Sequence, residues 1–184
     1  MDESLKKLGP QLLRAPPANK PVVVMTCGIA GAGKSTLSKA ILAHYPNYER
    51  LSNDATLANK HGIYGADYEP GKYDQLLDEA CDENEARLKK LLIEGQKDVV
   101  LDRSFYSKED REEIKEVIEG HGGRWVLVYL KAKSKDFLWD RITKRRQEGI
   151  NADCAYDITK EILDRYWNGF EAPENEGEIV IEVS

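Results

Sequence analysis

The sequence lacks long hydrophobic runs. Its apolar stretches fall far short of the roughly 20 residues that a membrane-spanning helix needs, so we do not expect an integral membrane protein. The first residues, MDESLKKLGP, are acidic and lack the apolar centre of a secretory signal. A cytoplasmic location is therefore the expectation.

Cysteine and positive charge are also in short supply. The three cysteines, Cys27, Cys81 and Cys154, form no CxxC pair, so neither a disulfide framework nor a zinc site is predicted. Against 33 acidic residues stand 27 Lys and Arg, which gives a formal net charge of -6. This balance disfavours broad, non-specific binding to nucleic acid, although a local basic groove remains open.

The chain has about the length of one domain, enough to bury a core without disulfides or metals, at 184 residues. Residues 1–20 end in the proline-rich APPANKP and are expected to form an N-terminal arm with one short amphipathic turn. Residues 21–184 are expected to form the domain itself.

Apolar strands alternate with amphipathic helices along this domain. PVVVMTC is a continuous β-branched run, typical of a strand buried on both faces of a parallel sheet. Further strands are expected in YERLSND, KDVVLDRS, RWVLVYLKA and GEIVIEV. Helices are expected to begin at residue 34, to run from about residue 73 to 94, to follow the N-caps Ser107 and Ser134, and to include YDITKEILDRYWNGF. ATLANKHGIYGADYEPGKY is expected to be mostly irregular. The pattern predicts an α/β fold with ligands at the carboxyl ends of the strands.

The glycine-rich segment GIAGAGKS, residues 28–35, indicates phosphate binding. It fits G-x-x-x-x-G-K-[ST] at every required position and lies between a predicted strand and a predicted helix. Backbone N–H groups of such a loop surround phosphate oxygens, the lysine reaches the outer phosphates and the serine ligates Mg²⁺. A turn used only for packing would not require Lys-Ser-Thr. The predicted nucleotide contacts are Gly28, Ala30, Gly31, Ala32, Gly33, Lys34, Ser35 and Thr36.

Two aspartates are expected at strand ends near this loop. Asp102 closes VVLD, where a carboxylate can hold Mg²⁺ or its water, or can simply cap a turn. Asp54 in LSND could accept the proton of an attacking hydroxyl; the alternative is an N-cap or an Asx-turn.

A basic helix supplies the candidate lid. Arg141 and Arg145 are four residues apart, hence on one helical face, where two guanidiniums could clamp the migrating phosphoryl group. The alternative is a solvated basic helix end, and Arg146 is a weaker candidate. Asp102 leads into DRSFY rather than a DxxG switch, and no NKxD element follows, so a compact phosphotransferase is favoured over a GTPase.

A resemblance to the compact P-loop kinases is carried by GIAGAGKST, SND, GKYDQLLDEACDENEARLKKLLIEGQKDVVLDRSFYSKEDR, DRITKRR and FEAPENE. The chain is most similar to the group that includes the kinase domain of polynucleotide kinase, chloramphenicol phosphotransferase and zeta-toxin-like kinases. The similarity runs from about Pro21 to the end. It implies a three-layer P-loop NTPase fold with a five-stranded parallel sheet in the order 2-3-1-4-5, and ATP-dependent phosphoryl transfer to a hydroxyl.

The resemblance also assigns roles to single residues. Lys34 and Ser35 would bind phosphate and metal, Asp54 would activate the acceptor, and Asp102 would be the partner carboxylate. Arg141 and Arg145 would be the lid arginines, which touch adenine or the phosphates. Pro173 would lie at the adenine edge, although a turn-forming proline explains this residue nearly as well.

The chain departs from this pattern after its third strand. Polynucleotide-type members often carry Asp-Thr-Asn or Asp-Ala-Asn there, whereas this chain has Asp102-Arg103-Ser104. Arg103 could contact an anionic acceptor or pair with a structural acid. The departure weakens a specific expectation of a nucleic-acid 5′ end as acceptor.

The segment between Asp54 and the long helix is the expected acceptor wall. Tyr64, Tyr68 and Tyr73 could stack on a base or an aromatic ligand, or pack the loop, and His61 is expected at the surface. Core burial is expected for the three tryptophans, Trp125, Trp139 and Trp167.

The expected function is a kinase that uses ATP and Mg²⁺ and phosphorylates a hydroxyl of a nucleoside, nucleotide or other small molecule. The alternatives are a polynucleotide 5′-hydroxyl kinase and a non-catalytic ATP- or ADP-binding regulator. Nucleic acid is open as a partner but not favoured, a membrane partner is not expected, and the oligomeric state is left open.

Overall fold

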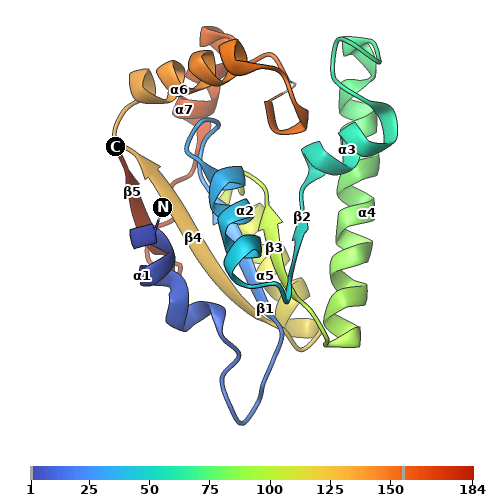
Figure 1. Ribbon diagram of the computed structural model, residues 1–184, viewed down its shortest axis with the longest axis vertical. Helices are drawn as coiled ribbons and strands as arrows, with labels where there is room; N and C mark the ends of the chain where they lie inside the picture. The colour runs from blue at the N-terminus through green and yellow to red at the C-terminus, as the bar shows by residue number, and fades with distance from the viewer. Residues whose placement is uncertain (1, 155) are drawn as a thin grey trace.

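The computed structural model describes residues 2–154 and 156–184. It contains a five-stranded parallel sheet in the order β2-β3-β1-β4-β5, as predicted (Figure 1). The strands are β1 (Val22–Cys27), β2 (Tyr48–Leu51), β3 (Asp98–Asp102), β4 (Arg124–Ala132) and β5 (Ile179–Val183). Within the described ranges, we find no helix that has both the length and the apolar character to cross a membrane.

The helices lie where the alternating pattern predicts them, with one addition. They are α1 (Asp2–Leu12), α2 (Lys34–His44), α3 (Asn53–His61), α4 (Tyr73–Glu94), α5 (Lys108–Gly120), α6 (Lys135–Glu148) and α7 (Lys160–Gly169), with short 3₁₀ turns η1 (Pro70–Lys72) and η2 (Ala152–Cys154). The two predicted serine caps are confirmed: Ser107 accepts from the N–H of Asp110 and Ser134 from that of Phe137.

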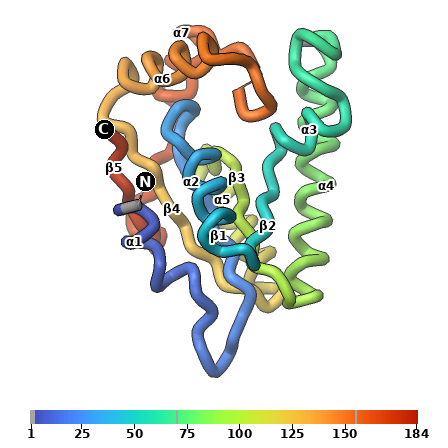
Figure 2. The backbone as a smooth tube through the Cα atoms, in the orientation of Figure 1, coloured from blue at the N-terminus to red at the C-terminus, as the bar shows by residue number. Residues whose placement is uncertain are grey.

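The sheet is covered on both faces, which explains why β1 is apolar except at Thr26, whose hydroxyl donates to the Leu101 carbonyl. Val22 and Val24 face a cluster formed with α1, α2, α6 and α7. Val23 and Met25 face a second cluster formed with α4 and α5. Because successive side chains of a strand point to opposite faces, a strand buried on both sides needs apolar residues at every position. Figures 1 and 2 show the resulting three layers.

Helix α3 corrects the sequence prediction. The segment after Asp54 was expected to be mostly irregular, but Asn53–His61 is helical. The Ser52 hydroxyl caps it by accepting from the N–H of Ala55, and Thr56 donates to Asn84 of α4 at 3.0 Å. The glycines that suggested a loop begin only at Gly62, where the helix ends.

The N-terminal residues form a longer helix than the expected short turn. Leu5, Leu8 and Leu12 recur every three or four residues along α1 and are buried in the cluster that contains β1 and α2. The Tyr48 hydroxyl donates to the Leu12 carbonyl at 2.7 Å. Pro10 lies inside this helix, and burial of the three leucines offsets its missing backbone bond.

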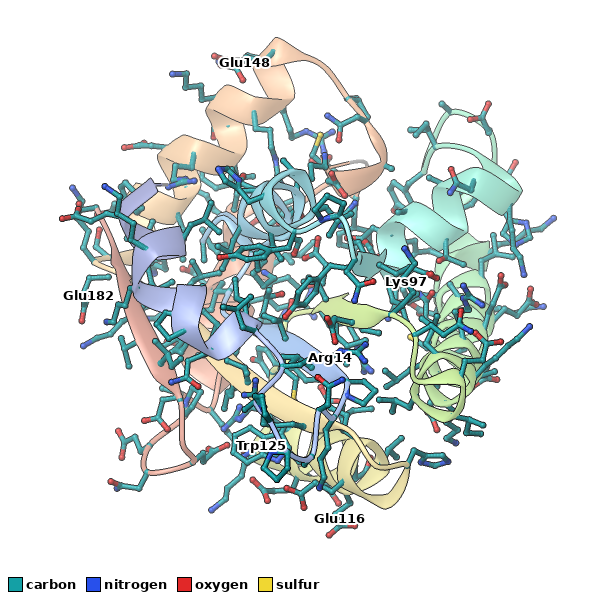
Figure 3. All side chains as sticks on the ribbon, turned by 60° about the horizontal axis from the view of Figure 1, so that its bottom comes forward. Arg14, Lys97, Glu116, Trp125, Glu148 and Glu182 are labelled. Atoms are coloured by element: carbon teal, nitrogen blue, oxygen red, sulfur yellow. The ribbon has the colours of Figure 1, made fainter. Side chains whose placement is uncertain are left out.

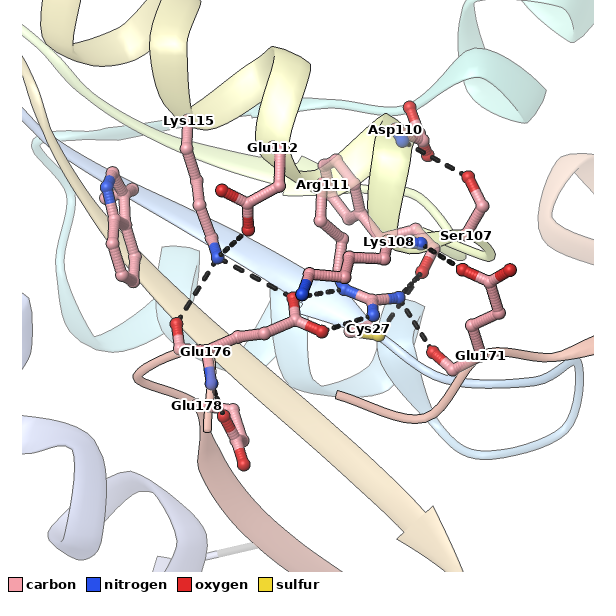
Figure 4. Close-up of polar contacts among 12 residues, drawn as sticks. Cys27, Ser107, Lys108, Asp110, Arg111, Glu112, Lys115, Glu171, Glu176 and Glu178 are labelled. Atoms are coloured by element: carbon pink, nitrogen blue, oxygen red, sulfur yellow. Dashed lines mark hydrogen bonds and ion pairs between the residues drawn. The ribbon is translucent and has the colours of Figure 1, made fainter. Parts of the chain in front are cut away.

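A buried ion pair joins α5 to the segment before β5 (Figure 4). The Arg111 side chain is 0% exposed and donates to both Glu176 carboxylate oxygens, at 2.7 and 2.6 Å. It also donates to the carbonyls of Phe105 and Glu171, at 3.0 and 2.8 Å. These hydrogen bonds lower the pKa of Glu176 and keep it charged. Burial raises the pKa of the nearby Cys27 to about 12.

The tryptophans and Arg14 lie at the margins of the two clusters. The three tryptophans expected in the core are half-buried and pack against its edges: Trp125, Trp139 and Trp167. The indole of Trp125, which is labelled in Figure 3, donates to Glu119 at 2.8 Å. Arg14 donates to the Asp98 carboxylate and the Gly95 carbonyl, at 2.8 and 2.7 Å, and so attaches the approach to β1 to β3.

We expect Leu8→Ala to lower the free energy of unfolding by about 2–5 kcal/mol, because the side chain is fully buried and a cavity would remain. The matched control is Leu13→Ala, since Leu13 is 58% exposed and its truncation should change stability by less than about 0.5 kcal/mol. Urea denaturation of both variants measures the difference. Equal effects would contradict a role for α1 in the core.

We expect Arg111→Ala to lower the free energy of unfolding by about 3–5 kcal/mol, because it leaves the Glu176 carboxylate buried without its partner. Arg87→Ala is the control. Arg87 pairs with Glu49 at the surface, and its loss should cost less than about 1 kcal/mol. Thermal and denaturant unfolding provide the comparison, and a loss at Arg111 no larger than at Arg87 would show that the buried pair is dispensable.

Candidate functional site

The glycine loop between β1 and α2 is shaped by close backbone contacts. A Cβ on Gly28 would lie 2.9 Å from the Leu130 carbonyl oxygen, and one on Gly31 would lie 3.0 Å from that of Leu138. Both glycines also have positive φ angles, 144° and 84°. The Gly28 N–H donates to the Ser104 carbonyl at 3.0 Å, which attaches the loop to the chain leaving β3. Side chains at these two positions would distort the loop.

Lys34 starts α2, and the charges of two aspartates act on it. Its Nζ donates to the Ile29 carbonyl at 3.1 Å, across the loop. Burial lowers the pKa of Lys34, while Asp102 and Asp54 oppose that shift. The ammonium group is therefore held near the loop by negative charge, where it can meet the outer phosphates of a nucleotide.

A cavity of about 430 Å³ opens in front of this loop, and we call it the main cavity. It lies at the carboxyl ends of β1 and β3, where the chain connections diverge to opposite sides of the sheet. The predicted site residues that line it are Ala30, Gly31, Gly33, Lys34, Ser35, Thr36, Asp54, Asp102, Arg103 and Arg145, and Tyr73 joins them. Gly28 and Ala32 instead pack beneath the loop.

Asp102 has a partner that the sequence analysis missed. Arg50 of β2 donates to Asp102 Oδ2 from Nε at 2.8 Å and from Nη2 at 2.5 Å. The same guanidinium donates to Asp153 Oδ1 at 2.5 Å, and Lys39 donates to Asp153 Oδ2 at 2.5 Å. An arginine within a short strand that pairs with β3 was the available signal. This network joins the sheet to the connection between α6 and α7.

Asp54 lies in the first turn of α3 rather than at the end of β2. Its side chain is exposed, but what it faces is the main cavity, whose walls surround it. This enclosure raises the pKa of Asp54, the Asp102 charge raises it further, and Lys34 opposes the shift. A carboxylate with a raised pKa is a stronger proton acceptor than an ordinary aspartate.

The residues present fit a magnesium ion. The Ser35 hydroxyl and the Asp102 carboxylate line the same cavity beside Lys34. Mg²⁺ commonly uses one or two protein oxygens together with phosphates and water, which matches this small donor set. Asp102 Oδ2 accepts hydrogen bonds from Arg50, which leaves Oδ1 as the oxygen that could face the ion.

The lid arginines point to different places. Arg145 lines the main cavity, and its Nε is buried without a hydrogen-bond partner among the described residues. Arg141 lies over the Phe137 ring at 5.3 Å, and its Nη2 is 3.3 Å from where a Cβ of Gly33 would be. Arg146 donates to the Tyr156 carbonyl at 3.2 Å. Of the three, Arg145 is placed to meet an anion in the cavity.

Arg103 forms an ion pair with Asp110 of α5 at 3.0 Å and also lies over the Phe105 ring. Of the two readings of this residue, the pairing with a structural acid is therefore observed. Arg103 and Asp110 both line the main cavity, so a contact with an acceptor is still open as a proposal.

Tyr64 and Tyr68 lie behind the main cavity rather than on its wall. They line a void of about 10 Å³ beside Asp54, about the size of one water molecule. Tyr73 and Tyr156 line both this void and the main cavity. His61 ends α3 and lies 3.9 Å from Glu79, away from both spaces.

A second cavity of about 230 Å³ lies on the other side of the loop. It is apolar and aromatic, and Ile29 lines both cavities. Pro173, the residue predicted at the adenine edge, is buried, while its neighbours in FEAPENE line the space. The complete lining is Ile29, Tyr129, Leu130, Ala132, Trp167, Phe170 and Ala172. Such a lining suits a flat, largely apolar group such as a nucleotide base.

Solved structures share this fold. A protein from Chloroflexus aurantiacus that carries a provisional assignment as a kinase superposes with a TM-score of 0.69 at 19% identity, over 89% of this chain and 88% of that one. A chain of the Pnkp1/Rnl/Hen1 RNA repair complex gives 0.64 at 17% identity, over 82% of this chain and 44% of that one. Kti12 from Chaetomium thermophilum, in complex with ADP-AlF3, gives 0.59 at 12% identity, over 87% and 88%. At these identities the likeness shows the fold alone.

No curated protein sequence matches the chain significantly. A family model does: the model described as an AAA domain matches residues 23–173, a range that includes the glycine loop, Asp54, Asp102 and both lid arginines. The predicted P-loop domain and its fold are confirmed. Because the match covers most of the chain, this protein belongs to the AAA domain family of P-loop proteins.

Proposed function

We propose that this protein is an ATP-dependent kinase that transfers the γ-phosphoryl group of Mg-ATP to a hydroxyl of a small molecule, such as a nucleoside or nucleotide. One observation carries the proposal: Lys34, Arg145 and Asp54 line one cavity together with Ser35 and Asp102. A site that only bound nucleotide would not require a carboxylate with raised pKa beyond the loop. The arrangement supplies both cationic groups for phosphate and a proton acceptor for a hydroxyl.

The two cavities divide the proposed nucleotide site. The triphosphate would lie along the glycine loop, in reach of Lys34 and Arg145, and the base would enter the second cavity, since Ile29 lines both spaces. Ser35 and Asp102 would hold Mg²⁺. When bound, the ion neutralises charge on the phosphate oxygens.

The proposed step is a direct displacement. The acceptor hydroxyl oxygen forms a bond to the γ-phosphorus, and the bond between that phosphorus and the β,γ-bridging oxygen breaks, so that ADP leaves. The hydroxyl proton passes to the Asp54 carboxylate. Lys34 and Arg145 stabilise the negative charge on the transferred group, and most of the catalysis is positioning.

Two alternatives keep specific support. A polynucleotide 5′-hydroxyl kinase agrees with the likeness to a chain of an RNA repair complex, but the formal net charge of -6 does not favour it. A nucleotide-binding regulator without transfer agrees with the likeness to Kti12 bound to ADP-AlF3. The regulator predicts that Asp54 is dispensable, whereas the kinase requires it.

We expect Asp54→Asn to lower the rate of transfer by about 100-fold or more and to leave ATP and ADP affinity nearly unchanged, because the amide keeps the shape but cannot take the proton. Transfer is measured with γ-labelled ATP, Mg²⁺ and a panel of nucleosides, nucleotides, 5′-hydroxyl oligonucleotides and sugars. Nucleotide affinity is measured separately by calorimetry.

The matched control for this experiment is Asp140→Asn. Asp140 is exposed on α6 and lines neither cavity, so its transfer rate should equal that of the unmodified protein. Full transfer by Asp54→Asn would remove Asp54 from the mechanism. Binding of ATP with no transfer to any acceptor would favour the regulator.

We expect the transfer rate to fall as the pH is lowered, and this fall should begin at a pH above the ordinary aspartate pKa of about 3.9. Asp54 takes the proton only when it is ionised, and its raised pKa means that protonation begins at a higher pH than for an ordinary aspartate. The rate measured from pH 4 to 8 at saturating ATP tests this. A rate that stays constant down to pH 4 would contradict a raised pKa at the proton acceptor.

A further inference from the structure

Four tyrosines, none of them from the glycine loop, line part of the main cavity, and we call this part the tyrosine end. Tyr73 of α4, Tyr156 of the α6–α7 connection, Tyr106 of the β3–α5 connection and Tyr166 of α7 all line it. The Tyr73 and Tyr156 rings are 4.6 Å apart at 32°, and those of Tyr106 and Tyr166 are 6.2 Å apart at 66°. Four separate elements thus present ring surfaces to one space, and aromatic surfaces bind flat rings well.

Two arginines in or beside the main cavity are already neutralised by carboxylates. Arg103 pairs with Asp110 at 3.0 Å, and Arg50 pairs with Asp102 and Asp153 at 2.5 Å. The cationic groups of the main cavity for which the described residues show no ion pair, Lys34 and Arg145, belong to the loop and its lid helix. A phosphate at the tyrosine end would find paired arginines and would also meet carboxylates.

The α6–α7 connection covers part of the main cavity. Figures 1 and 2 show this segment reaching from the α6–α7 layer toward α3. Asp153 accepts from Arg50 and from Lys39, at 2.5 Å each, and the Tyr156 ring lies 5.1 Å from that of Tyr64. The main cavity, which this segment partly covers, has a volume of about 430 Å³, which is enough for a small ligand beside the triphosphate.

From these observations we propose that the acceptor is an uncharged alcohol that carries an aromatic or heteroaromatic ring, with the size of a nucleoside. This inference rests on the proposed kinase function and narrows it. The ring packs against Tyr156 and Tyr73, the hydroxyl points toward Asp54, and acceptors that carry a phosphate are rejected.

Matched acceptors test the charge and the ring separately. A nucleoside and its 3′-monophosphate share the same free 5′-hydroxyl and differ in charge, whereas ribose has hydroxyls but no ring. We expect kcat/KM for the best nucleoside to exceed that of its 3′-monophosphate, and that of ribose, at least tenfold. An aryl-substituted propanediol in the same panel distinguishes nucleosides from other ring-bearing alcohols. Preference for the 3′-monophosphate or for a 5′-hydroxyl oligonucleotide would overturn the proposal.

Variants of Tyr156 test the ring-binding role. Tyr156→Ala should raise KM for the ring-bearing acceptor about tenfold or more with a smaller effect on kcat, and should reduce the preference over ribose. Tyr156→Phe keeps the ring, so its KM and its preference over ribose should equal those of the unmodified protein. Tyr45→Ala is the control, because Tyr45 packs on Tyr48 and lines neither cavity. An unchanged preference in Tyr156→Ala would overturn ring recognition by this residue.

A binding measurement separates this inference from the kinase proposal. In Asp54→Asn protein saturated with ADP and Mg²⁺, calorimetry should show that the nucleoside or the aryl alcohol binds at least tenfold more tightly than the nucleoside 3′-monophosphate. If this holds but no label is transferred by the unmodified protein, the kinase function fails while the ligand class stands. If transfer occurs but favours charged acceptors, the kinase function stands and the ligand class fails.

Discussion

The parallel pairing of β1 with β3 is the constraint on which the site depends. It places Thr26 opposite Asp102, so that the glycine loop and the carboxylate leave the sheet side by side. The Gly28 N–H donates a hydrogen bond to the Ser104 carbonyl, which attaches the chain leaving β1 to the chain leaving β3. Because a parallel strand order requires crossover helices, α2 and α5 start at the same edge and bring Lys34 and Asp110 to it.

The buried Arg111 connects this edge to the second cavity. One guanidinium nitrogen donates to the carbonyls of Phe105 and Glu171, which lie next to residues that line the two cavities. Glu176 balances the charge, so the interior holds a full ion pair with its hydrogen bonds made. The walls of both cavities are in this way attached to α5, which packs on the sheet.

A second ion network connects the sheet to the cover of the main cavity. Arg50 forms ion pairs with two carboxylates, that of Asp102 in β3 and that of Asp153 in the α6–α7 connection. The same residue therefore orients the candidate metal carboxylate and holds the connection that presents Tyr156. One guanidinium thus connects the carboxylate beside the glycine loop to the segment that covers part of the main cavity.

Much of the fold could be predicted because its signals are local. The β-branched runs, the serine caps and the glycine loop act within a few residues of chain, and the structure has the corresponding strands, caps and loop. Helix α3 escaped prediction because glycines after Gly62 masked a helix that is stabilised by the Ser52 cap and by Asn84 of α4. The apolar stripe of α1 was underestimated because the proline-rich approach to β1 indicated an arm rather than a packed helix.

In the candidate site, too, some features follow from the sequence and others only from the tertiary structure. The sequence by itself determined that Lys34, Ser35, Asp54 and Asp102 would meet, because each follows a strand whose end lies at one edge of a parallel sheet. Only the tertiary structure decided that Arg50 holds Asp102, that Arg145 rather than Arg141 faces the main cavity, and that tyrosines from four elements line this cavity. These contacts join residues far apart in the chain, and their geometry depends on how helices dock on the sheet, which no local pattern encodes.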